Sequence, residues 1–195
     1  RLNDPAISDQ FGFAFQSDFG DPEDAFSAGL DAGVASGDPA PGFGAYPVAG
    51  QAPPQAGDFD GPQAIPPYDN RVDNFAFHPD FRIDRILFRE IVGRVTDAFY
   101  VRPHVRFTIA KSSYGRLDAQ LWGIVSGAMD PSSTPGGERM LGVEIDPSLI
   151  YTTRMGFGAS LDQGTLIPLG GLDNPDLGLG AKPAQLWRLR LFLEY

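Results

Sequence analysis

The chain closes with Trp187-Arg188-Leu189-Arg190-Leu191-Phe192-Leu193-Glu194-Tyr195, and this stretch decides the fold. Its apolar residues occupy every second position: Trp187, Leu189, Leu191, Leu193 and Tyr195. Successive side chains of a β-strand point to opposite faces, so this spacing predicts a strand with one apolar face. The other face carries three charged residues, with Phe192 as the exception. Such a strand lies between an apolar and a polar environment, either in a membrane or in a soluble sheet.

Six other stretches show the same period-2 alternation, which predicts seven strands and an all-β, antiparallel fold. The predicted strands cover residues 10–16, 26–34, 99–109, 117–125, 141–153, 157–169 and 184–195. Most of them approach the roughly 9–11 residues that a tilted strand needs to cross a bilayer. Trp122 and Ile124 break the alternation, because they place large apolar side chains on an otherwise polar face.

The connections between these strands alternate in length along the chain. Short turns are expected at 18–24, 111–115 and 154–156, and longer connections at 35–97, 130–139 and 170–183. This alternation is typical of outer-membrane barrels, which have short periplasmic turns and long external loops. A soluble sandwich has no reason to sort its loops by end. We therefore expect residues 1–195 to form a single segment of an antiparallel transmembrane β-barrel, with short turns on the periplasmic side.

Seven strands are an odd number, whereas bacterial single-chain barrels have an even number, from about eight upwards. We therefore expect this chain to supply the C-terminal strands of a larger barrel. The missing strands would come from an upstream part of the same gene or from a second chain. The sequence begins with Arg1 and shows no signal-peptide pattern, which indicates a processed product, a fragment or the ordered part of something longer.

Composition excludes several classes of protein. The formal charge of −10 argues against a nucleic-acid partner, because phosphate binding needs a basic face. The absence of cysteine excludes disulfide frameworks and zinc-thiolate sites. No apolar run approaches the roughly 18 residues of a transmembrane helix.

The insertion at 35–97 has two parts. Residues 37–71 have the Gly, Pro, Ala and Asp composition of a flexible loop. The spacing of apolar residues that follows predicts a short amphipathic helix over 79–92, with Pro79 near its start and Gly93 as its stop. This helix would fold into the barrel interior, lie across its mouth or pack on its rim; alternatively, part of the stretch continues the third strand.

Few residues indicate chemistry. His78 and Asp80 are only two positions apart, so a contact within a turn is a better interpretation than an acid–base pair, and no Gly-x-Ser-x-Gly nucleophile motif is present. The stretch 58–61 resembles the start of a calcium loop but lacks the later Gly and Glu. We therefore expect no enzymatic activity, no cofactor and no dedicated metal site.

The charged residues of the polar faces are the clearest functional indication. We expect the barrel interior to be lined by Arg102, His104, Arg106, Asp118, Glu144, Asp146, Asp162, Arg188 and Arg190. In a water-filled pore such groups bias the passage of ions, and in a filled barrel they pair across strands and brace the wall. Asp162 and Arg190 are candidates for such a pair. The expected membrane-facing residues of the last strand are Trp187, Leu189, Leu191, Leu193 and Tyr195.

Two stretches resemble parts of a known family. Residues 77–106, FHPDFRIDRILFREIVGRVTDAFYVRPHVR, resemble a segment of the large outer-membrane β-barrels of myxobacteria and their relatives. Residues 141–169 are similar to the penultimate hairpin of that family, and the terminal strand that ends in an aromatic resembles the closing strand of outer-membrane barrels in general. The resemblance implies a location in the bacterial outer membrane of Gram-negative cells and recognition by the barrel assembly machinery. It transfers no activity and no catalytic residue.

These observations predict a porin-like passive channel for small polar solutes or ions, embedded in the lipid bilayer beside lipopolysaccharide. The alternative is a structural or anchoring outer-membrane barrel that binds a partner protein through its long external loop. A third interpretation is a soluble, secreted β-sandwich, in which the alternating apolar faces are buried.

Overall fold

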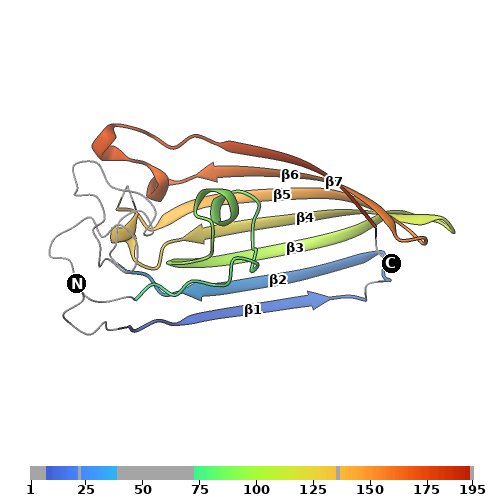
Figure 1. Ribbon diagram of the computed structural model, residues 1–195, viewed down its shortest axis with the longest axis horizontal. Coiled ribbons are helices and arrows are strands. Elements are labelled where there is room, and N and C mark those ends of the chain that lie inside the picture. The colour runs from blue at the N-terminus through green and yellow to red at the C-terminus, as the bar shows by residue number, and fades with distance from the viewer. Residues whose placement is uncertain (1–7, 22, 39–72, 135–136, 194–195) are drawn as a thin grey trace.

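The computed structural model describes residues 8–21, 23–38, 73–134 and 137–193. Seven strands form one antiparallel sheet in the order β1-β2-β3-β4-β5-β6-β7, so that each strand pairs with its neighbours in sequence (Figure 1). The strands are β1 (Gly12–Phe19), β2 (Phe26–Ala35), β3 (Ala98–Lys111), β4 (Gly115–Gly127), β5 (Met140–Thr153), β6 (Phe157–Pro168) and β7 (Ala184–Leu193). The all-β, antiparallel prediction is confirmed, and every predicted strand is present within a few residues of its expected bounds.

The connections between strands lie at one end of the sheet or the other according to their length. The short turns that join β1 to β2, β3 to β4 and β5 to β6 lie at one end, and the longer connections lie at the other (Figure 1). Among the described residues of the longer connections, three short 3₁₀ helices are present: η3 (Pro131–Ser133), η4 (Gly170–Leu172) and η5 (Pro175–Leu177). The strands β1 and β7 form opposite edges, and the sheet does not close on itself.

One face of the sheet is apolar and exposed. A single row across six strands shows the pattern: Phe15, Ala32, Val101, Val125, Val143 and Ile167 stand side by side in the register. Most of the large side chains of this apolar face remain open, from 38% exposed at Tyr151 to 72% at Leu193. No helix among the described residues is long and apolar enough to span a membrane.

The other, polar face is covered by residues 75–95, the covering segment, which runs across the middle strands (Figure 1). Ile83, Ile86 and Leu87 of this segment are at most 5% exposed. They belong to one core with Tyr100, Ile124, Leu141 and Leu166 of the sheet. The buried core of the described chain therefore lies on the polar face.

The predicted helix over 79–92 is largely absent. Only η2 (Leu87–Ile91) is helical, and it is a single π-type turn. The backbone N–H groups of residues 85–87, in the middle of the predicted helix, donate to the side chain of Glu144 on the sheet and not to carbonyl groups of the preceding turn. The apolar spacing that predicted the helix reflects residues that face the sheet.

Candidate functional site

The polar face contains the charged residues that the sequence singled out. The expected interior residues of β3, β4, β5, β6 and β7 share this face, as the strand register requires. Most of them are paired, and three clusters account for the pairs of Arg102, Arg106, Asp118, Asp162 and Arg190.

The first cluster lies between β2 and β3. Nε of Arg102 donates to Oδ2 of Asp31 at 2.9 Å, and its Nη2 also contacts this oxygen. The guanidinium group of Arg102 lies 4.3 Å from the ring centre of Trp122, on which the ring of His104 also stacks at 4.1 Å. Trp122, an exception to the alternating pattern, thus packs under two of the charged residues. These two contacts explain why this large aromatic side chain lies on the polar face.

Close approach of the backbone makes room for this stack. A Cβ atom on Gly29 would overlap both the His104 ring and a backbone oxygen of β1. Glycine at this position therefore allows the imidazole to lie flat against β2. Nε2 of His104 is 3.7 Å from a carboxylate oxygen of Asp31 and from one of Asp18.

The second cluster lies nearer the short turns, on β3 and β4. Asp118 accepts a hydrogen bond from Nε of Arg116 at 2.8 Å and one from Oγ1 of Thr108 at 2.7 Å. Arg106 approaches Asp118 to 4.0 Å and donates to Oγ of Ser27 at 3.1 Å. Its position braces three adjacent strands through one carboxylate and one hydroxyl group.

The third cluster surrounds Asp162, whose side chain is fully buried. Arg190 of β7 donates from Nε to Oδ2 of Asp162 at 3.0 Å, and Nη2 is also 3.0 Å from this oxygen. Arg85 of the covering segment places Nη2 3.0 Å from the other oxygen, Oδ1. The expected pair of Asp162 and Arg190 is confirmed. The register sets Asp162 directly opposite Arg188, so the pair with Arg190 is diagonal.

Glu144 attaches the covering segment to the sheet. Its Oε1 accepts the backbone N–H groups of Arg85 and Ile86, both at 2.8 Å, and its Oε2 accepts that of Leu87 at 3.1 Å. The side chain is nearly fully buried, so these charge-assisted bonds form in a site of low dielectric. Asp146 lies buried on the same strand, two positions further along.

Asp84 is a buried acidic residue of the covering segment. Its Oδ2 accepts the N–H of Phe88 at 2.8 Å. Burial raises the pKa of Asp84 to about 7, with a further contribution from the neighbouring charge of Glu144. Asp84 and Arg85 were not singled out by sequence reasoning. They lie between Ile83 and Ile86, which are buried against the sheet.

The remaining predicted residues lie as follows. The last strand exposes Trp187, Leu189 and Leu191 to between 68% and 70% on the apolar face, whereas Tyr195 lies outside the described residues. His78 and Asp80 make only a local turn contact, in which the N–H of Asp80 donates to Nδ1 of His78 at 3.2 Å. Both side chains are more than three-quarters exposed.

Comparisons with known proteins give no further assignment. The chain matches no protein-family model, no curated protein and no solved structure. Within the described part of the chain, no group of three or more His, Cys, Asp or Glu residues is placed to hold a metal ion. The function must therefore be inferred from the two faces of the sheet.

Proposed function

We propose that this chain supplies the C-terminal strands of an outer-membrane β-barrel that acts as a porin-like passive channel for small polar solutes or ions. The observation that carries the proposal is the size of the uncovered apolar face. Seven strands about 4.8 Å apart, each with some ten residues rising about 3.3 Å, span a surface of roughly 1,000 Å². The largest apolar patch of a typical soluble monomer is only about 300–600 Å². A lipid bilayer is the partner that fits an apolar face of this extent.

The placement of the loops supports the same proposal. Short turns at one end and long connections at the other are the pattern of outer-membrane barrels. The strands, of 8 to 14 residues, include several long enough to cross a bilayer at a tilt. The two open edges, β1 and β7, need partner strands in lipid, because unpaired backbone groups are costly there. Upstream strands of the same barrel, or a second chain, would supply them.

The polar face would line the interior. Most of its charges are paired, so they brace the wall, and the second cluster lies toward the short turns. A conduit along this face would be narrow, because the covering segment packs on the other half of it. Its solutes would therefore be small.

The covering segment also favours a second candidate function, an anchoring barrel that binds a partner protein through the long loop. Its apolar core and its bonds to Glu144 fill part of the interior, as expected of a barrel with little conductance. A soluble β-sandwich is the weakest candidate, because it requires a second layer over the apolar face, and no described residue provides one.

One experiment separates these functions. The native species is extracted with detergent and run on a semi-native gel, unboiled and boiled, and the unboiled band is then reconstituted for single-channel recording. A heat-modifiable band well above 21 kDa, with conductance steps, is expected for the channel. A heat-modifiable band without conductance and with a co-purifying protein would favour the anchor. A compact 21 kDa particle extracted without detergent would refute both.

A further inference from the structure

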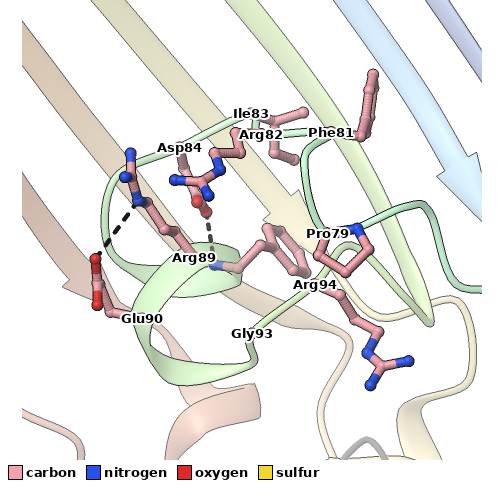
Figure 2. A pocket seen from close by; sticks show the side chains of 10 residues that line it. Pro79, Phe81, Arg82, Ile83, Asp84, Arg89, Glu90, Gly93 and Arg94 are labelled. Atoms are coloured by element: carbon pink, nitrogen blue, oxygen red, sulfur yellow. Dashed lines mark hydrogen bonds and ion pairs between the residues drawn. The ribbon is translucent and has the colours of Figure 1, made fainter.

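The covering segment contains an open cavity of about 310 Å³, lined by residues between Pro79 and Arg94 (Figure 2). This volume is at the lower end of the range of about 300–1,000 Å³ that is typical of ligand pockets, which suits a small solute. The walls carry three arginines, Arg82, Arg89 and Arg94, and two acids, Asp84 and Glu90. None of these five residues belongs to the three clusters that brace the sheet.

Positive charge is in excess around the cavity. Oε1 of Glu90 lies 3.5 Å from Nε of Arg89 and 3.2 Å from Nη2 of Arg188, so two guanidinium groups share one carboxylate. Arg82 forms no ion pair with any residue that the structure describes. Burial lowers the pKa of Arg89, and the charges of Arg188 and Arg82 lower it further. An anion in the cavity would relieve this repulsion.

Two of the arginines are placed to hold such an anion together. Figure 2 shows the side chains of Arg82 and Arg89 extending over the same part of the cavity wall, whereas Arg94 extends away from them, and the charge of Arg82 is near enough to lower the pKa of Arg89. Guanidinium groups bind tetrahedral oxyanions through parallel N–H···O bonds. Arg94 is therefore a matched control within the same wall.

The carboxylate of Asp84 has one oxygen that lacks a hydrogen-bond donor in the part of the chain that the structure describes. The residue is only 7% exposed, and its Oδ2 is occupied by the N–H of Phe88. Its Oδ1 is buried and has no hydrogen-bond partner among the described residues. A buried acceptor without a donor is costly, so a ligand with a hydroxyl group would satisfy it.

We propose that this cavity binds hydrogen phosphate, with its charged oxygens on Arg82 and Arg89 and its hydroxyl group donating to Oδ1 of Asp84. The site deepens the proposed channel function, on which its role as a solute site rests, by assigning a class of solute. Binding itself requires only the folded covering segment. Binding and conductance are therefore separate measurements.

Sulfate is the discriminating probe. Above the pKa of about 7 that burial gives Asp84, both hydrogen phosphate and sulfate are tetrahedral dianions, but only hydrogen phosphate carries a hydroxyl donor. A site built from charge alone binds both equally. The proposed site prefers hydrogen phosphate by about tenfold or more, the value of one hydrogen bond to a charged group.

The test is isothermal titration of inorganic phosphate and of sulfate into the full, detergent-purified protein. Arg82→Gln and Arg89→Gln are each expected to weaken phosphate binding by on the order of tenfold, whereas Arg94→Gln leaves it within about twofold. Asp84→Asn is expected to abolish the preference over sulfate, because its oxygen still accepts from Phe88 and its NH₂ group donates to either anion. Circular dichroism checks that each variant is folded.

Three results would overturn the site: no phosphate binding by the wild-type protein, equal binding of phosphate and sulfate, or equal effects of Arg82→Gln and Arg94→Gln. A protein that conducts but binds no phosphate would refute the site and leave the channel standing. A protein that binds phosphate with the expected preference and does not conduct would support the site and refute the channel.

Discussion

Glu144→Gln should release the covering segment from the sheet. The carboxylate of Glu144 accepts three backbone N–H groups, two on Oε1 and one on Oε2. Hydrogen bonds to a charged acceptor contribute about 1.5–3 kcal/mol each, against about 0.5–1.5 kcal/mol for a neutral one. Glutamine keeps one oxygen, so two bonds each lose about 1 kcal/mol, and its NH₂ group faces the third N–H, which is left unpaired at a cost of about 1–3 kcal/mol.

The sum is about 3–5 kcal/mol, part of which is offset because Asp84 no longer faces a negative neighbour. We take about 3 kcal/mol as the net loss, which corresponds to roughly a hundredfold increase in the fraction of molecules with the segment detached. Hydrogen exchange of a peptide covering residues 82–90 is the assay, because it reports local opening. Exchange there should accelerate by about this factor, while peptides from β3 and β4 remain protected. Glu138→Gln, a change at an exposed carboxylate, is the control and should have no effect. Unchanged exchange in Glu144→Gln would refute the role assigned to this carboxylate.

Three further predictions concern single residues. Burial raises the pKa of Asp97 to about 6, so its contribution to stability is full below its ordinary pKa of 3.8 and is lost as the pH rises through about 6. Thermal melts between about pH 4 and pH 7 should therefore show a larger loss of stability in the wild-type protein than in Asp97→Asn, which keeps only the loss due to other buried acids such as Asp84; parallel pH profiles would contradict this. Asp162→Asn leaves two arginines facing a neutral group, and should lower the free energy of unfolding in urea by about 3–5 kcal/mol; a loss below about 1 kcal/mol would show that the buried pairs are dispensable. Leu189→Arg on the apolar face should destabilise the protein in lipid by about 2–4 kcal/mol, measured by refolding into vesicles, whereas Leu189→Val should have a much smaller effect; equal effects would show that this face does not contact hydrocarbon.

The strands could be predicted from sequence because each one separates two environments. Neither a helix, with its period of 3.6 residues, nor an irregular loop sustains period-2 alternation over about ten residues, and the register follows once the turns are short. The bounds of β5, predicted as 141–153, differ from Met140–Thr153 by a single residue. The interior residues could be named for the same reason, since a face is fixed once one residue on it is known.

The covering segment could not be predicted because its path depends on contacts distant in sequence. The backbone N–H groups of residues 85–87 donate to Glu144, more than fifty residues away, and these bonds compete with the helix that local spacing favoured. Neither the partner nor the competition is visible in the segment itself. The exceptions at Trp122 and Ile124 were the available signal, because large apolar side chains on a polar face indicate that something packs on them. Ile124 indeed lies in the core with the segment.

The location of this core bears on what covers the apolar face. In a soluble sandwich the apolar face of a sheet is the core, and its side chains are the best-buried residues of the chain. Here the described chain buries Tyr100, Ile124 and Leu166 on the face that also carries the ion pairs, and it leaves the richer apolar face exposed. None of the described residues covers this apolar face. An apolar face that is wide, continuous across neighbouring strands and free of charge along β7 fits hydrocarbon better than a protein surface, because specific protein interfaces carry a polar rim and hydrogen bonds. If the proposed barrel function holds, the sheet would present its apolar face to lipid, and the covering segment would pack on the opposite, polar face.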